Sequence, residues 1–210
     1  MTGVLVRCFT YLLVVAALAE GLRLEAVALD KTRVYSEFGY TEWAQTAILV
    51  MVVGLLAWRA VRHAPVRELA VCMALFFGIL LIRENDQTFE LFLPHGSWKF
   101  FAAVVFLALI TYFARHRTVV LGQLRAFAQS VSFGVMLCGF VVLVFSRLFG
   151  RTHYWQEVME DNYIRLVKNA AQEGVELLAQ GLFLIAVVEF VIMRGAVPLY
   201  KAQSKPTSAD

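Results

Sequence analysis

Charged residues are scarce in this sequence: only 17% of the 210 residues are Asp, Glu, Lys or Arg, whereas 60% are hydrophobic. In a soluble domain roughly a quarter of the residues are charged. A soluble chain of this length also has no interior large enough to hold so much apolar surface. The apolar residues also occur in long runs, not in stripes with the period of a half-buried helix or strand. This composition excludes an ordinary soluble domain and predicts that the chain is embedded in lipid.

Motifs that would indicate a particular chemistry are missing as well. Cys8, Cys72 and Cys138 lie inside apolar runs without CxxC or Cys/His spacing, so we interpret them as buried hydrophobic residues. No HExxH, GxSxG, P-loop or dinucleotide-binding glycine motif occurs. The predicted spans hold no histidine, so a haem with axial histidines is unsupported and no cofactor is indicated. Because the basic residues are scattered and the net charge is only +3, no nucleic-acid partner is indicated.

The apolar runs have the length of membrane-spanning helices. A helix needs about 20 residues to cross the hydrocarbon layer, and the alternation typical of a membrane β-barrel is absent. We therefore predict an all-α, polytopic transmembrane bundle, a single domain over residues 1–200 followed by a polar cytoplasmic tail at 201–210. The predicted spans are residues 4–20, 43–60, 66–84, 98–114, 130–149 and 174–193.

Two of these spans have alternatives. The first could be a signal peptide, because Arg7 precedes an apolar stretch and residues 17–19 fit a small-x-small cleavage site. We favour its retention, since uncleaved signal anchors commonly begin polytopic chains. The third has only 14 uninterrupted apolar residues, 69–82, which alone would suit a re-entrant helix. Charged residues at both of its ends extend it by snorkelling to the interfaces, which favours a true crossing.

The distribution of basic residues predicts the orientation. With six spans both termini lie on one side of the membrane, and basic residues are dense there, because Arg59, Arg62 and Arg67 fall within nine residues. Loops rich in Lys and Arg stay in the cytoplasm. We therefore expect both termini to be cytoplasmic in a bacterial inner membrane. The opposite side holds thirteen of the sixteen acidic residues.

Two of the acidic outward segments are predicted to be short. Residues 21–42 mix apolar and charged side chains, which is typical of an interfacial helix, and we expect that helix to break at Gly39. Residues 84–97 end in a turn from Pro94 to Ser97, and a new helix is expected to start at Trp98.

The third outward segment leads into the last span. No proline occurs from His153 to Met193, so we predict one amphipathic helix that bends at Gly174. Asp161 and Arg165 have the spacing of a favourable pair on such a helix. Its polar residues recur at helical spacing and form a stripe: Asn169, Gln172, Glu173, Glu176 and Gln180.

This stripe is the main functional signal in the sequence. Polar groups inside spans are costly and usually face the interior of a bundle or a wet cavity. The alternative is structural, with the stripe hydrogen-bonded across packed helices. The candidate residues for binding or for an ion pathway are Glu84, Asp86, Glu176, Gln180 and Arg83. Glu176 is the expected carboxylate, and Arg83 is its candidate counter-charge.

A metal site on the outward side is a weaker hypothesis. His153 and Glu157 have i, i+4 spacing, and Glu90 and His95 lie in the other acidic segment. Together they could supply two imidazoles and several carboxylates. Such coincidences are common in an acid-rich loop, so ordinary surface residues are the favoured interpretation.

Three kinds of function remain open. The first is a small permease, sensor or accessory subunit with a polar cavity open to the outside. The second is a membrane-embedded enzyme that acts on a lipid or lipid-linked substrate at the outer face. The third is a scaffold that docks a partner through residues 153–173, where Met159, Tyr163 and Leu166 would be exposed. The lipid bilayer is the one partner that the sequence identifies.

Overall fold

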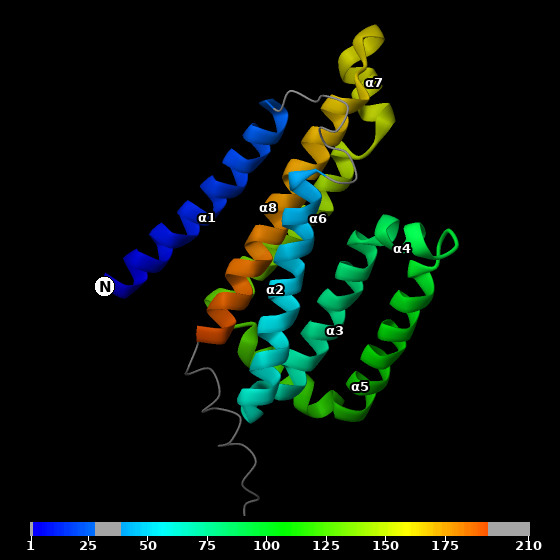
Figure 1. Ribbon diagram of the computed structural model, residues 1–210. Helices are drawn as coiled ribbons and strands as arrows, with labels where there is room; N and C mark the ends of the chain where they lie inside the picture. Colours follow the sequence, from blue (N-terminus) through cyan, green and yellow to red (C-terminus); the bar gives the residue numbers. More distant parts are fainter. Residues whose placement is uncertain (1, 28–38, 193–210) are drawn as a thin grey trace, which may run out of the picture. The chain divides into compact units, whose positions relative to one another are not determined.

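The computed structural model describes residues 2–27 and 39–192, which form helices and turns without any strand (Figure 1). The α-helices are α1 (Thr2–Val27), α2 (Tyr40–Arg62), α3 (Arg67–Glu84), α4 (Asp86–Phe92), α5 (Trp98–Phe127), α6 (Val131–Phe149), α7 (Thr152–Met159) and α8 (Arg165–Ile192). Short 3-10 turns occupy Ala64–Val66 and Glu160–Asn162. In the described ranges six helices, α1, α2, α3, α5, α6 and α8, are long and apolar enough to cross a membrane. This result confirms the all-α fold class and a multi-pass membrane protein.

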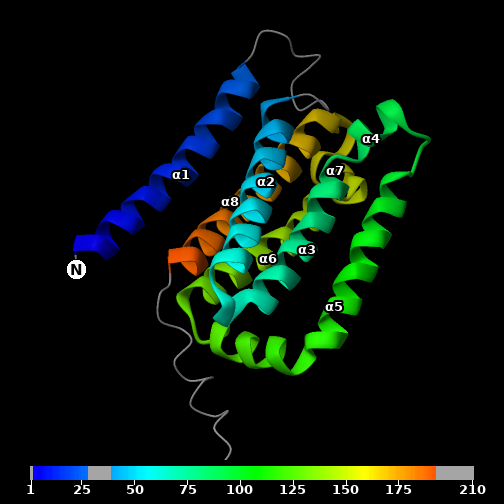
Figure 2. The same ribbon diagram turned by 60° about the horizontal axis from the view of Figure 1, so that its bottom comes forward.

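The fourth crossing helix is longer than predicted. The residues after position 114 were expected to form a loop, but α5 continues to Phe127. Its direction changes at His116, where the backbone leaves the helical region at φ −115° and ψ 18°. Figure 2 shows the segment after this kink passing the start of α3. The expectation that no histidine lies in a spanning helix is therefore wrong for α5.

The long helix predicted from position 153 to position 193 is also wrong, because the chain breaks between α7 and α8. Glu160 has a positive φ of 49°, and Tyr163 is extended with ψ 121°. A non-glycine residue at positive φ is incompatible with a continuing helix. Asp161 lies in the 3-10 turn and Arg165 begins α8, so these two residues are not on the same helix. Past it, α8 runs from Arg165 through Gly174 to Ile192 as one helix.

Contacts between Cα atoms divide the chain into two compact units. The first unit contains residues 1–48 and 135–185, and the second contains residues 49–134 and 186–210. The boundary crosses α2, α6 and α8 within the helices. A single domain over residues 1–200 therefore stays a prediction. The predicted tail at 201–210 and half of the predicted interfacial segment, residues 28–38, lie outside the described residues, and α1 extends to Val27.

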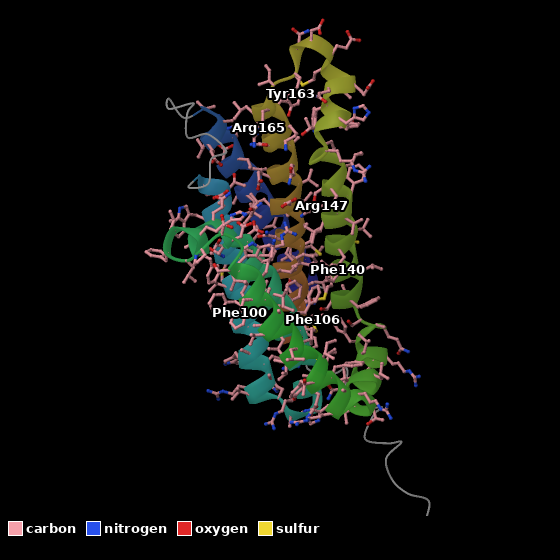
Figure 3. All side chains as sticks on the ribbon, turned by 90° about the vertical axis from the view of Figure 1, so that its right-hand side faces the viewer. Phe100, Phe106, Phe140, Arg147, Tyr163 and Arg165 are labelled. Atoms are coloured by element: carbon pink, nitrogen blue, oxygen red, sulfur yellow. The ribbon has the colours of Figure 1, made fainter. Side chains whose placement is uncertain are left out.

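The first unit packs its helices closely at glycines. A Cβ atom placed on Gly181 of α8 would lie 2.8 Å from Leu18 Cδ1 of α1, and one on Gly139 of α6 would lie 2.7 Å from the Phe183 ring of α8. Small residues allow such close approach of helices in membranes. Phe140 of α6 packs on the same Phe183 ring, with the ring centroids 4.7 Å apart. Figure 3 shows Phe140 on α6 beside α8.

In the second unit α3 and α5 lie side by side, and α4 joins their ends (Figures 1 and 2). Gln123, a buried residue of α5, fixes the start of α3: its Oε1 accepts the Leu69 amide proton at 2.8 Å. Its Nε2 donates to Pro65 O at 3.0 Å and to Glu68 Oε2 at 2.7 Å. The side chain thus satisfies an amide that the first turn of a helix leaves without a partner. The expected turn before Trp98 is also present, closed by a bond from Ser97 N to Pro94 O.

Candidate functional site

A buried carboxylate, Glu176, lies about three turns into α8 and is only 4% exposed. Arg147 Nη2 of α6 lies 2.9 Å from Glu176 Oε1, and Gln172 Nε2 donates to the same oxygen at 3.2 Å. Ser146 Oγ is 3.3 Å from this oxygen, but its one proton is better directed to Leu143 O at 2.6 Å. Charge inside a span is tolerated when it is paired. Glu176 therefore has an ion-pair partner from α6 and a hydrogen-bond donor from its own helix.

The ion pair between Arg147 and Glu176 joins an exposed cation to a buried anion. The Arg147 side chain is 46% exposed, whereas that of Glu176 is 5% exposed. Arg147 lies in the last turn of α6, beside α8 (Figure 3). Its stem can lie along the apolar helix while the guanidinium reaches toward the membrane surface.

A second polar contact joins α2 to α8. Gln45 of α2 is fully buried, and its Nε2 donates to Glu173 O at 3.3 Å and to Glu173 Oε2 at 3.2 Å. Its carbonyl oxygen Oε1 is buried and accepts no hydrogen bond from the described part of the chain. An unpaired buried carbonyl costs free energy, so an apolar residue would be the cheaper choice at this position.

A second buried carboxylate connects α1 to α2. Glu25 lies near the end of α1, is 8% exposed, and its Oε2 accepts the Thr41 amide proton at 3.1 Å. The Thr41 hydroxyl donates to the same oxygen. Thr41 lies in the first turn of α2, whose amides need acceptors and whose dipole favours a negative charge. Glu25 therefore acts as a cap for α2 that is supplied by the preceding helix.

The stripe predicted on the last span exists on α8. At about 100° per residue, Gln172, Glu173, Glu176 and Gln180 fall within an arc of about 100°. Gln180 lies one turn beyond Glu176 on this arc, is 4% exposed, and its Oε1 accepts no hydrogen bond among the described residues. The polar side chains at the start of the stripe contact both α2 and α6, so this part of α8 has a polar face against two neighbouring helices.

The candidates chosen from the sequence fall into the two units. Glu176 and Gln180 are buried in the first unit. Arg83, Glu84 and Asp86 are half-buried in the second unit, at the junction of α3 and α4. The cation that pairs with Glu176 in the structure is Arg147. The assignment of Arg83 as a counter-charge stays a prediction.

The weaker metal candidates form two separate pairs. His95 Nδ1 is 2.8 Å from Glu90 Oε2, and His153 Nε2 is 3.8 Å from Glu157 Oε1. Three of these four side chains are largely exposed, at 90% for His95, 85% for His153 and 74% for Glu157. No group of three or more His, Cys, Asp or Glu side chains that could hold a metal ion occurs in residues 2–27 and 39–192. A metal site that combines the two pairs stays a prediction.

The surface expected of a scaffold is present in part. Leu166 is 38% exposed, but Met159 and Tyr163 are only half-buried. Val158 and Ile164, which were not singled out, are more exposed, at 59% and 53%.

Sequence reasoning missed three of the residues around the stripe, Gln45, Ser146 and Arg147. Gln45 lies in the predicted second span, and Ser146 and Arg147 lie near the end of the predicted fifth span. A lone polar residue inside a span was the available signal, because such residues usually face the interior of a bundle. Their partners on α8 were not predictable from spacing.

Comparisons with protein-family models, with curated proteins and with solved structures found no match to this chain.

Proposed function

We propose that this multi-pass membrane protein binds a small solute or ion and acts as a small permease, a sensor or an accessory subunit. In this proposal the protein resides in a bacterial inner membrane, and its polar face is reached from the outside. The ligand is recognised at the polar face of α8, with Glu176 as its central carboxylate. Glu84 and Asp86 are candidates for residues that a ligand passes or contacts at the second unit.

The observation that carries this proposal is the one-sided pairing of Glu176. Both the ion pair with Arg147 and the hydrogen bond from Gln172 are made to Oε1. A carboxylate kept only for helix packing would gain most by satisfying both oxygens. An oxygen that keeps its lone pairs inside a span is instead suited to accept a proton, a cation or a donor group of a solute.

The exposure of Arg147 adds a route for exchange. A fully buried ion pair is expensive to separate, because each partner would be left uncompensated. Here the cation is half-exposed and the anion is buried. Arg147 can move toward the membrane surface while an arriving cation takes over the charge of Glu176. Binding and release at Glu176 thus avoid a bare charge in lipid.

The test is the substitution Glu176→Gln in a strain that lacks the chromosomal gene. Growth of this strain is compared across an array of solutes, pH values and salts with plasmid-borne wild-type or variant protein. We expect the wild type to restore any solute-dependent growth defect and Glu176→Gln to lose that effect at equal protein level in the membrane. Glu20→Gln, which changes an exposed carboxylate on α1, is the matched control and should behave like the wild type.

Full restoration of growth by Glu176→Gln, with unchanged thermal stability of the purified variant, would remove Glu176 from the function. Loss of the protein from the membrane would be a folding effect. In that case Glu176→Asp, which keeps the charge but shortens the reach to Arg147, provides the second comparison.

A further inference from the structure

Two buried amide oxygens on the polar face of the first unit accept no hydrogen bond from the described residues. They are Gln180 Oε1 on α8 and Gln45 Oε1 on α2. Glu176 lies on the same face, and its contacts with Arg147 and Gln172 are made by Oε1. All three residues are more than nine-tenths buried. The nitrogen of Gln45 is engaged, because Gln45 Nε2 donates to Glu173.

Helix geometry brings two of these side chains within reach of one ligand. Glu176 and Gln180 are four residues apart, so their Cβ atoms lie about 5 to 6 Å apart on one face of α8. Gln45 approaches the same face from α2 through Glu173, which is three residues before Glu176. Residues three or four apart on a helix are neighbours. Gln45 therefore contacts α8 about one turn before Glu176, and Gln180 lies about one turn after Glu176.

The chemistry of this set is that of a cation ligand. Uncharged amide carbonyls and a carboxylate are the hard oxygen donors that alkali-metal ions take in place of water, and an ammonium ion donates protons to the same atoms. An anion is disfavoured, because the site contains a carboxylate and two amide oxygens with open lone pairs. Ca²⁺ is also disfavoured, since it takes six to eight oxygen ligands and usually several carboxylates. One carboxylate that already shares an arginine suits a single positive charge.

We propose that Glu176 Oε2, Gln180 Oε1 and Gln45 Oε1 form a binding site for a small monovalent cation. This inference rests on the proposed function, for which it names the class of ligand. Glu176 supplies the charge, and the two glutamines replace part of the hydration shell. Arg147 is positively charged and lies beside the other carboxylate oxygen, Oε1. Its charge lowers the affinity of Glu176 for a second cation, so the ion can leave as well as bind.

The experiment measures the thermal stability of the full chain in lipid nanodiscs. Sodium, potassium and ammonium chloride are each titrated against N-methylglucamine chloride at constant ionic strength. An ion that binds only the folded protein raises the melting temperature with the logarithm of its concentration. At ten times the Kd, the rise for a chain of this length is about 3 to 6 °C. We expect such a rise for at least one of the three ions.

The variant Gln180→Leu separates a site from a salt effect. It removes one oxygen ligand and also removes an unpaired buried carbonyl. We therefore expect it to lose the ion-dependent rise while its melting temperature in N-methylglucamine stays equal or increases. Gln45→Leu should weaken the rise as well, but it also removes two bonds to Glu173. Gln87→Leu, at an exposed position of α4, is the matched control and should keep the full rise.

Two results would overturn the cation site: no rise with any of the three ions, or an equal rise in the wild type and Gln180→Leu. If ions have no effect while Glu176→Gln still abolishes the growth phenotype, the cation is wrong and the proposed binding function stands. If the Gln180-dependent rise is found while Glu176→Gln restores growth fully, the site stands and the proposed function fails.

Discussion

Glu90 links α4 to the turn that follows it through two contacts. Gly96 N donates to Glu90 Oε1 at 3.1 Å, and His95 Nδ1 lies 2.8 Å from Oε2. The bond from Gly96 and, after it, the bond to His95 lower the pKa of Glu90 below its ordinary value. Gly96 has φ +82°, a conformation that glycine adopts without strain. The turn therefore depends on one carboxylate and one glycine.

The lowered pKa of Glu90 predicts a pH dependence for this turn. A carboxylate whose folded pKa is lowered contributes fully above its ordinary pKa of 4.5, and the contribution is lost as the pH falls through the folded pKa. We expect the amides of residues 95–98 to lose protection against hydrogen exchange below about pH 4.5, after correction for the intrinsic rate. Hydrogen-exchange mass spectrometry measures this protection.

The variant Glu90→Gln should abolish the pH dependence, and the control variant Glu160→Gln should keep it. An unchanged profile in Glu90→Gln would assign the pH dependence to another group.

Residues far apart in the sequence form the contacts that the sequence could not predict. The stripe on α8 was found because helical spacing is a local pattern. Gln45 and Glu173, in contrast, are 128 positions apart, and no local pattern in either segment predicts that they are in contact. Arg147 was counted as an interface charge, since an arginine at a helix end is ordinary there. Its pairing with Glu176 depends on how α6 packs on α8, which spacing does not encode.

Helices were predicted well where apolar length alone decides the structure, and poorly where the backbone changes direction. Six crossings follow from the runs of apolar residues, because lipid requires internally hydrogen-bonded helices. The break after α7 has no such signal. No glycine or proline lies in residues 160–164, yet Glu160 takes a positive φ. The kink at His116 also has no glycine or proline to predict it, so the residues after it were expected to form a loop.

Helix α1 is held to α8 by close packing at Gly181, which predicts the effect of filling that position. A Cβ there would lie 2.8 Å from Leu18 Cδ1, so the larger side chain of Gly181→Leu must displace the Leu18 side chain and disturb its packing on α8. Overpacking of this kind costs about 1 to 3 kcal/mol, which lowers the melting temperature by about 2 to 4 °C per kcal/mol. Thermal unfolding in nanodiscs measures this effect.

The matched control for this substitution is Gly78→Leu. A Cβ on Gly78 meets no atom within 4 Å. Leucine also has a better helix propensity than glycine, so this variant should be neutral or slightly more stable. Equal destabilisation by both substitutions would mean that the loss at Gly181 comes from the helix itself and not from the packing of α1.

At the scale of the whole molecule, arginines gather at one end of the second unit. Gln123 Oε1 accepts a hydrogen bond from Leu69 N, which places the last turns of α5 against the start of α3. The arginines of those segments, Arg67 and Arg125, therefore share one end, and Asp86 and Glu90 follow the other end of α3. The predicted orientation rests on such arginines, because clustered arginines between spans are retained in the cytoplasm.

The predicted orientation can be tested with reporter proteins fused to this chain. With both termini in the cytoplasm, a green fluorescent protein fused after Asp210 should be fluorescent, and alkaline phosphatase fused there should be inactive. The same phosphatase fused after His95, in the turn between α4 and α5, should be active, because the enzyme folds only outside the cytoplasm. The arginines favour this arrangement by their number in short loops, so replacing Arg62 and Arg67 by glutamine should lower the activity ratio between the two fusions. Active phosphatase after Asp210 would reverse the orientation, and it would also place the polar face of α8 on the cytoplasmic side.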